Sequence, residues 1–250
     1  MRAESEIGAA LVTGATSGLG RAVAVRLASA GFAVAAVGRS ERGLAETAEQ
    51  LKACGVHAVP LQADLADTAS LESLVDEAAR ELGGLSVVVN AAGTDVPGPA
   101  EKLTLEEWNQ VLAVNLTAPF ALARAAMPHL RRRGGGLVVN VSSVAGRRGW
   151  ANASAYCATK FALTGLTQSL AAEGRDDGIR VCILYPGAMS TNWGTFDPAE
   201  RDGADRPVAD DRDALDPAVV ADLIAWMATS PGRPVLNEVT MTPLREGGWP

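Results

Sequence analysis

The sequence has few of the residues that build metal sites and disulfide frameworks. Its 250 residues include three cysteines and two histidines. The cysteine count is odd, no Cys-x-x-Cys pair occurs, and His57 and His129 are far from the spacing of zinc ligands. This composition indicates a reducing, cytoplasmic setting, and it predicts neither a disulfide framework nor a bound metal.

Long apolar runs and excess positive charge are also missing. No stretch approaches about 18 consecutive apolar residues, and the first residues, MRAESEIGAALVTG, lack the apolar core of a signal peptide. We therefore expect nothing to span a membrane. The net charge of −7 disfavours a nucleic-acid partner, because phosphate backbones are bound by basic faces. The one dense basic cluster, residues 131–133, precedes a run of glycines and is typical of a helix C-terminus.

The composition that remains is that of a globular protein. Hydrophobic residues make up 48% of the chain and charged residues 20%, and a domain of this length can bury roughly 70–75% of the surface of its unfolded chain. No change of composition, internal repeat or low-complexity tract divides the sequence. We predict a single domain over residues 1–250.

Short apolar, β-rich runs alternate with longer segments of helical periodicity. We expect strands at 9–14, 32–38, 57–64, 85–93, 135–143, 178–187 and 237–243, and helices at 21–31, 41–55, 67–84, 104–133, 154–174 and 216–231. Nearly continuous apolar strands that alternate with helices predict an α/β fold, a single Rossmann-type doubly wound parallel sheet of about seven strands with helices on both faces. Asp67 or Ser70 should cap the third helix, Pro119 should kink or break the fourth, and residues 191–216 should form a substrate lid.

The segment TGATSGLG, residues 13–20, joins the first expected strand to the first expected helix. Its glycines, Gly14, Gly18 and Gly20, allow a ligand to approach the main chain closely. The free N–H groups and partial positive charge at the start of the helix suit a pyrophosphate. The spacing differs from the usual GxGxxG, but its place in the first strand–helix unit predicts that it binds a nucleotide.

The end of the second expected strand indicates which nucleotide. An NAD-binding fold carries an acidic residue there for the ribose hydroxyl, whereas this chain has Gly38, Arg39 and Ser40. A guanidinium suits a 2′-phosphate, and the missing carboxylate removes a repulsion. We therefore predict NADP(H) rather than NAD(H). The alternative is a surface arginine at the start of a helix.

Further motifs complete a pattern. NAAG (90–93) ends the fourth expected strand, Ser143 ends the fifth, YCATK (156–160) begins thirteen residues after that serine, and PGAMST (186–191) ends the sixth. Together with TGATSGLG, these motifs resemble the classical short-chain dehydrogenase/reductase family over about residues 7–243. NAAG departs slightly from the more frequent NNAG of the family.

The resemblance implies roles for particular residues. Tyr156 would be the catalytic acid/base, Lys160 would hold the nicotinamide ribose and lower the tyrosine pKa, Ser143 would bond the substrate oxygen, and Asn115 would hold a water in a proton relay. Asp64 would contact the adenine, and Asn90 would support the central strand and the adenosine ribose. The residues that it assigns to NADP(H) are Gly14, Thr16, Ser17, Gly18, Leu19, Gly20, Arg39, Ser40, Asp64, Leu65, Asn90, Ala91, Gly93, Tyr156, Lys160, Pro186, Gly187, Met189 and Thr191.

The chemistry of YCATK can also be argued from its residues. Tyr156 and Lys160 are four positions apart, so they share one helix face, about 6 Å apart along the axis. A free phenol has a pKa near 10, and a nearby ammonium, together with the nicotinamide cation of the oxidised cofactor, favours the phenolate. A lowered pKa would suit general acid–base catalysis. Standing alone, the pair could also be an ordinary surface pair.

The expected activity is NADPH-dependent reduction of a ketone or aldehyde to an alcohol. The substrate pocket should be lined by residues 94–99, 144–153 and 188–215, which include Arg147, Arg148, Trp150, Trp193 and Phe196. These aromatics suggest a tailoring ketoreductase of aromatic polyketides or other secondary metabolism, although they could equally be packing or interface residues. The alternatives are a 3-oxoacyl-(acyl carrier protein) reductase-like enzyme, a small-alcohol dehydrogenase and a non-catalytic NADP-binding regulatory protein. The resemblance implies a homotetramer or homodimer.

Overall fold

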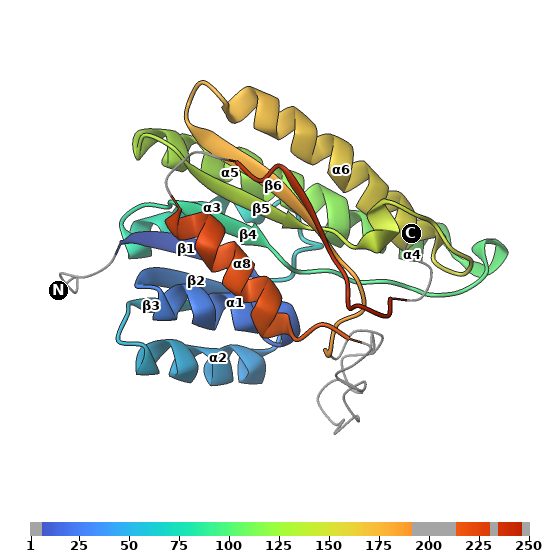
Figure 1. Cartoon of the computed structure of the whole chain (residues 1–250), viewed down its shortest axis with the longest axis horizontal. Coiled ribbons are helices and arrows are strands. Elements are labelled where there is room, and N and C mark those ends of the chain that lie inside the picture. Colours follow the sequence, from blue (N-terminus) through green and yellow to red (C-terminus); the bar gives the residue numbers. More distant parts are fainter. Residues whose placement is uncertain (1–6, 192–213, 231–234, 247–250) are drawn as a thin grey trace.

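The computed structural model describes residues 7–191, 214–230 and 235–246. Its centre is one parallel sheet of seven strands in the order β3-β2-β1-β4-β5-β6-β7 (Figure 1). The strands are β1 Gly8–Thr13, β2 Phe32–Gly38, β3 Ala58–Gln62, β4 Val87–Asn90, β5 Gly136–Val141, β6 Ile179–Pro186 and β7 Glu238–Met241. The predicted fold class, a Rossmann-type doubly wound sheet, is confirmed.

Helices cover both faces of this sheet (Figure 1). One face carries α1 Gly18–Ser29, α2 Glu41–Ala53 and α8 Pro217–Thr229. The other carries α3 Leu71–Leu82, α5 Ala118–Arg132 and α6 Ser154–Gly174, with α4 Leu105–Leu112 beside α6. Short 3₁₀ turns lie at Ala100–Lys102 and Val144–Gly146.

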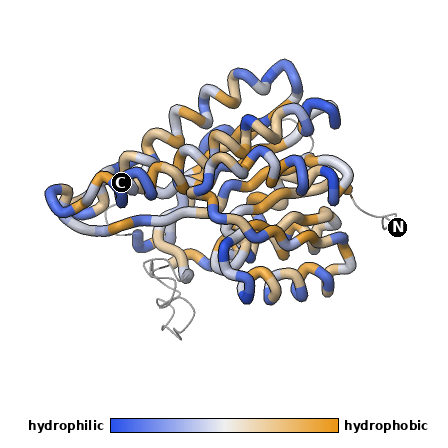
Figure 2. Tube along the Cα trace, turned by 180° about the vertical axis from the view of Figure 1, so that it is seen from behind, coloured by the Kyte–Doolittle hydropathy of each residue, from blue (hydrophilic) through white to orange (hydrophobic). Residues whose placement is uncertain are grey.

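The alternation of side chains along the strands divides the core into two layers. Ala10 and Val12 of β1 pack with α1, α2 and α8, whereas Ala9 and Leu11 pack with α3 and α5. All residues of β1 and β2 are buried, which explains why these strands read as continuous apolar runs rather than alternating ones. Figure 2 shows the hydrophobic positions gathered in the strands and the hydrophilic ones at the outer turns of the helices.

The order of strands changes direction at β1, because β2 and β3 lie on one side of it and β4 to β7 on the other. This strand pairs with β2 on one side and with β4 on the other. The registers place Thr13 beside Val37, and Asn90 beside Asn140, so the carboxyl ends of the central strands meet at one edge. Ligands of open parallel sheets bind at this reversal point, and the predicted site residues follow these strand ends.

Two expectations about helix boundaries are wrong. Asp67 does not cap the third helix, because α3 begins at Leu71. Ser70 occupies the N-cap position, but its side chain makes no capping hydrogen bond. Residues 64–67 instead form a turn in which Asp64 Oδ1 accepts from the N–H of Ala66 at 3.0 Å, and the carbonyl of Asp64 accepts from the N–H of Asp67 at 3.1 Å. The first helix begins at Gly18, three residues before the predicted 21, and Gly18 itself has a positive φ of +51°.

The long helical run at 105–132 is interrupted before Pro119 rather than at it. Residues Ala113–Thr117 form a π-turn, in which the N–H of Ala118 donates to the carbonyl of Ala113, and Pro119 lies in the first turn of α5. Proline has no N–H to donate, so it fits directly after the π-turn, where the regular ladder of helical hydrogen bonds is already interrupted. The π-turn contains Asn115, one of the predicted catalytic residues.

The same run, Leu105–Arg132, is long and apolar enough to cross a membrane by length and composition, although its apolar residues are not consecutive. Within the protein it is a core helix. Leu122, Ala126 and Leu130 have no exposed surface and pack with α3, and such packing is what makes a helix of a globular protein apolar.

Candidate active site

The glycine-rich turn between β1 and α1 is pressed against the end of β4. Gly14 has φ of +68°, and a Cβ added there would lie 2.9 Å from the backbone of Ala92. A Cβ on Gly20 would lie 2.2 Å from the carbonyl oxygen of Gly14. Side chains at either position would therefore collide with backbone, so the turn keeps its shape only with glycine.

The first turn of α1 presents backbone donors at this edge. Its N-cap residue, Ser17, has extended geometry and makes no side-chain cap hydrogen bond, and the first turn holds no acidic residue. The N–H groups of Gly18, Leu19 and Gly20 have no partner within the helix, because the first donors of any helix lack one. Together with the helix dipole they fit the pyrophosphate of a dinucleotide.

The end of β2 lies beside this turn. A Cβ on Gly38 would be 2.4 Å from Cγ2 of Thr16, so strand and turn are in close contact. Arg39 is exposed, and its guanidinium makes no hydrogen bond or ion pair within the described parts of the chain. Ser40 Oγ caps α2 by accepting from the N–H of Gly43 at 3.1 Å. Of these neighbours, Arg39 is the one with donors to spare for a phosphate.

The end of β4 is fixed by buried hydrogen bonds. Thr13 Oγ1 accepts from the N–H groups of Ala91 at 3.1 Å and Ala92 at 3.2 Å. Asn90 Nδ2 donates to Asn140 Oδ1 at 2.8 Å, while Asn90 Oδ1 is buried with no partner among the described residues. An unpaired buried acceptor is costly, and a ribose hydroxyl would satisfy it. Thr13 was not among the predicted site residues, although it begins the motif that predicted the turn.

The remaining predicted nucleotide residues lie at the same edge. Asp64 is exposed and Leu65 is buried after β3, and Gly93 follows Ala92 after β4. With the free donors of α1 and the unpaired Asn90 Oδ1, these positions fit a dinucleotide laid across the carboxyl ends of the strands. No group of three or more metal-ligating side chains gathers in the described residues.

The segment after β6 approaches the glycine-rich turn. Gly187 donates its N–H to the carbonyl of Met241 at 2.7 Å, and Met189 pairs with Leu215 in an isolated bridge. A Cβ on Gly18 would lie 3.4 Å from Thr191 Cγ2. Pro186–Thr191 therefore lies over the same edge as the turn. Most of the predicted lid, residues 192–213, lies outside the described residues, as do Trp193 and Phe196.

The two adjacent serines after β5 have different partners. Ser143 shares a hydrogen bond with the Tyr156 hydroxyl and accepts from the N–H of Ala145 at 3.1 Å. Ser142 Oγ instead donates to the carbonyl of Lys160 at 3.3 Å. The structure thus brings Ser143, and not its neighbour, to Tyr156.

Tyr156 and Lys160 lie one turn apart on α6 and are both buried. Lys160 Nζ is 5.5 Å from the centre of the Tyr156 ring and donates to the carbonyl of Val141 at 2.9 Å. The surface-pair interpretation of YCATK is therefore wrong, because both side chains point into the protein at the ends of β5 and β6.

The pKa of Tyr156 departs from the expected direction. Burial raises its pKa well above the ordinary value near 10, and the nearby Asp95 and Cys157 raise it further, whereas the Ser143 hydrogen bond lowers it. Burial also lowers the pKa of Lys160 to about 8. The net direction is upward because burial is the largest cause, and the expectation that Lys160 lowers the tyrosine pKa stays a prediction. The phenol is protonated at neutral pH and can act as a proton donor.

Asn115 holds the loop after β4. Its Oδ1 accepts from the N–H of Thr94 at 2.9 Å, and its Nδ2 donates to the carbonyl of Thr94 at 2.8 Å and to Thr159 Oγ1 at 3.2 Å. Both amide hydrogens are used, so this side chain ties the loop to α6. Its expected role in holding a water stays a prediction.

The predicted pocket residues after Ser143 lie near the surface. Arg147 forms an ion pair with Glu238 and lies 4.2 Å over the ring of Tyr185. Arg148 is exposed, and Trp150 is 48% exposed. Arg147 is therefore engaged with β6 and β7, whereas the Trp150 side chain is available to a ligand or to another chain.

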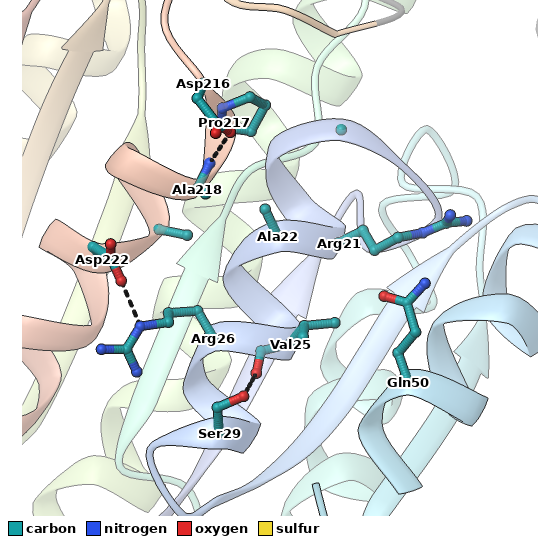
Figure 3. Close-up of a pocket in the computed structure, with 12 residues that line it drawn as sticks. Arg21, Ala22, Val25, Arg26, Ser29, Gln50, Asp216, Pro217, Ala218 and Asp222 are labelled. Atoms are coloured by element: carbon teal, nitrogen blue, oxygen red, sulfur yellow. Dashed lines mark hydrogen bonds and ion pairs between the residues drawn. The ribbon is translucent and has the colours of Figure 1, made fainter. Parts of the chain in front are cut away.

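A separate cavity of about 420 Å³ opens on the outer face between α1 and α8 (Figure 3). Its wall contains Arg26, paired with Asp222, and Arg21, whose Nε donates to Thr47 Oγ1 at 3.0 Å. None of the four predicted catalytic residues lines it. The candidate site is therefore the strand-end edge and not this cavity.

Comparison with known proteins agrees with this geometry. The family model of the short chain dehydrogenases matches residues 8–201. The chain is 38% identical over 224 residues to 3beta-hydroxysteroid dehydrogenase 1 of Eggerthella lenta, a match that covers 88% of this chain and 85% of that protein. It is also 38% identical over 186 residues to D-threitol dehydrogenase of Mycolicibacterium smegmatis, covering 74% and 71%.

A solved structure extends the likeness to the whole fold. A single-substitution variant of actinorhodin polyketide ketoreductase, with NADPH, matches with a TM-score of 0.85 at 28% identity, over 97% of this chain and 98% of that one.

Proposed function

Since this chain belongs to the short-chain dehydrogenase family, whose members are NAD(P)(H)-dependent oxidoreductases of alcohols and ketones, we propose that it reduces a ketone or aldehyde with NADPH, with Tyr156 as the proton donor. The observation that carries the proposal is the buried Ser143–Tyr156 hydrogen bond beside Lys160. It lies at the strand-end edge where the glycine-rich turn offers its donors.

The choice of NADPH rests on the end of β2. Arg39 is exposed, its guanidinium has no partner among the described residues, and position 38 is a glycine rather than an acidic residue. Arginine is the side chain that best matches the geometry of a phosphate. The matched polyketide ketoreductase contains NADPH, which supports the same choice here.

When bound at this edge, a reduced nicotinamide would supply the hydride that the carbonyl carbon needs. Ser143 holds the carbonyl oxygen, and Tyr156 donates a proton to it. The raised pKa of Tyr156 suits this direction, because it keeps the phenol protonated at neutral pH. Below about pH 8 Lys160 is an ammonium, and its positive charge stabilises the phenolate that proton donation leaves.

The substrate we propose is a cyclic or aromatic ketone of secondary metabolism, as for a tailoring ketoreductase. The likeness to a polyketide ketoreductase and to a hydroxysteroid dehydrogenase supports a polycyclic substrate. The likeness to D-threitol dehydrogenase favours the alternative of a small alcohol or ketone. A carrier-bound 3-oxoacyl substrate and a non-catalytic regulatory role are weaker alternatives.

We further propose a cytoplasmic homotetramer or homodimer. Exposed apolar side chains on α4, α5 and α6 support an interface there. Leu105 is 80% exposed, Phe120 45% and Phe161 47%, and large exposed apolar side chains are suited to contact with another chain.

The test measures oxidation of NADPH and NADH by the purified protein with polycyclic, aromatic and small aliphatic ketones. We expect oxidation of NADPH in preference to NADH, with the highest kcat/KM among cyclic or aromatic ketones. Binding of NADPH with no oxidation by any carbonyl compound would support the regulatory alternative instead.

A further inference from the structure

A buried carboxylate lies in the loop after β4, near the proposed proton donor. Asp95 is 8% exposed. Its Oδ1 accepts from the N–H of the next residue, Val96, at 2.8 Å. No ion pair or further hydrogen bond of this side chain is formed within residues 7–191, 214–230 and 235–246. The carboxylate is therefore largely removed from water without a cation beside it.

The loop that carries Asp95 is held on both sides by the catalytic half of the site. On one side Asn115 bonds both the N–H and the carbonyl of Thr94. On the other, the N–H of Gly98 donates to the carbonyl of Asn152 at 2.9 Å. Asn152, with φ of +63°, stands two residues before the start of α6. The charge of Asp95 also raises the pKa of Tyr156, which agrees with a position close to that phenol.

Burying such a carboxylate costs free energy. Removing an ionised carboxylate from water is costly unless it is paired or hydrogen bonded, and one backbone N–H satisfies only one of its acceptor positions. Acceptor positions that the protein leaves open beside the reacting group are suited to a donor brought by the substrate.

We propose that Asp95 accepts a hydrogen bond from a hydroxyl group of the substrate, carried one or two carbons from the reacting carbonyl. The preferred substrates would then be hydroxy ketones, or in the reverse direction diols. The inference rests on the proposed function. Each turnover converts one hydroxy ketone, one NADPH and one proton into one diol and one NADP⁺.

The experiment compares matched pairs of ketones that differ by one hydroxyl, hydroxyacetone with acetone and α-hydroxyacetophenone with acetophenone. We expect the wild-type protein to favour the hydroxylated member of each pair by at least about 100-fold in kcat/KM, because a site built to bind a hydroxyl discriminates strongly against its absence. Asp95→Asn keeps the acceptor for Val96. It should lower kcat/KM for the hydroxy ketones about 10- to 100-fold while changing that for the plain ketones less than about threefold.

The control is Asp222→Asn, which removes an equivalent charge from the exposed pair with Arg26 and should leave all four values unchanged. Thermal unfolding and NADPH binding confirm that each variant is folded. The inference is overturned if Asp95→Asn lowers kcat/KM equally for both ketones of a pair, or if the wild type does not prefer the hydroxylated ketone. The proposed NADPH-dependent reduction would stand in either case. Oxidation of NADPH by no carbonyl compound overturns the proposed function, and the inference with it.

Discussion

The two halves of the site are built by different means. On the β1–α1–β2 side, the groups that face a cofactor are backbone N–H groups and glycines, with one exposed arginine. On the β4–β5–α6 side, they are polar side chains held by hydrogen bonds, such as Ser143 to the Tyr156 hydroxyl and Asn115 to the backbone of Thr94. Cofactor binding on the β1–α1–β2 side should therefore be weakened by side chains added at the glycines. Catalysis on the β4–β5–α6 side should be weakened by the loss of single polar atoms.

The largest expected effect separates the two tyrosines of the chain. Tyr156→Phe removes the proposed proton donor and should lower turnover about 10²–10⁴-fold, the range of general acid catalysis, with NADPH affinity nearly unchanged. Tyr185→Phe is the matched control, because its hydroxyl is also bonded, to Thr164 at 3.1 Å, but lies outside the proposed machinery. Steady-state kinetics with NADPH titrations measures both. Equal losses of turnover in Tyr156→Phe and Tyr185→Phe would contradict the role of Tyr156 as the proton donor.

The catalytic half should also show a pH dependence of stability. The pKa of Lys160 is lowered from 10.5 to about 8 in the folded protein. Between these values the unfolded chain retains the proton and the folded protein has lost it, so the free energy of unfolding should rise with pH by up to about 3 kcal/mol. Above pH 10 the raised pKa of Tyr156 acts in the opposite sense.

Urea unfolding of the wild type and Lys160→Met between pH 7 and about 10 isolates this contribution. We expect the difference in unfolding free energy between the two to grow in favour of the wild type across that window. A difference independent of pH would mean that Lys160 keeps its ordinary pKa and that its burial has no electrostatic cost.

A change of charge at Arg39 tests the proposed preference for NADPH over NADH. Arg39→Asp should weaken NADPH binding about 10- to 100-fold, as expected for loss of charged hydrogen bonds, and should weaken NADH binding much less. Fluorescence titration of both nucleotides checks this. An equal loss for both would show that Arg39 does not contact the 2′-phosphate, and the preference for NADPH would have to come from elsewhere.

The smallest expected effect compares two glycines. Gly14→Ala places a Cβ 2.9 Å from the backbone of Ala92 at a φ of +68°, and it should cost about 1–2 kcal/mol of stability along with cofactor affinity. Gly165→Ala, within α6, meets nothing within 4 Å and should stabilise the protein by about 0.5–1 kcal/mol. Thermal unfolding distinguishes the two, and a shift in the same direction would contradict the account of the turn.

The sequence predicts the strands and the nucleotide turn well because these depend on local patterns. An apolar run such as Phe32–Gly38 directly predicts a buried strand, here β2. The glycine spacing of residues 13–20 predicts the nucleotide turn without knowledge of the fold. Features that depend on burial are missed. The pKa of Tyr156 is raised mainly because the phenol is buried, and the depth of that burial cannot be predicted from the spacing of YCATK.

Features that depend on distant contacts are missed for a related reason. By sequence, Asp95 is an ordinary acidic residue of a loop. Its burial depends on the contacts by which Asn115 and Asn152 hold that loop. Likewise, Asp67 is as good a helix cap as Ser70 by composition, and the local turn at 64–67 decides between them.

The central claim, that this protein delivers hydride from NADPH to a carbonyl carbon while Tyr156 supplies the proton, is tested most directly by isotope transfer. The wild-type protein would be supplied with NADPH deuterated at the transferable position, a cyclic ketone and ordinary water, and the alcohol product examined by mass spectrometry and NMR. We predict one deuterium on the carbinol carbon and none in Tyr156→Phe over the same time. Product without deuterium, or equal deuterium transfer by Tyr156→Phe, would contradict the account.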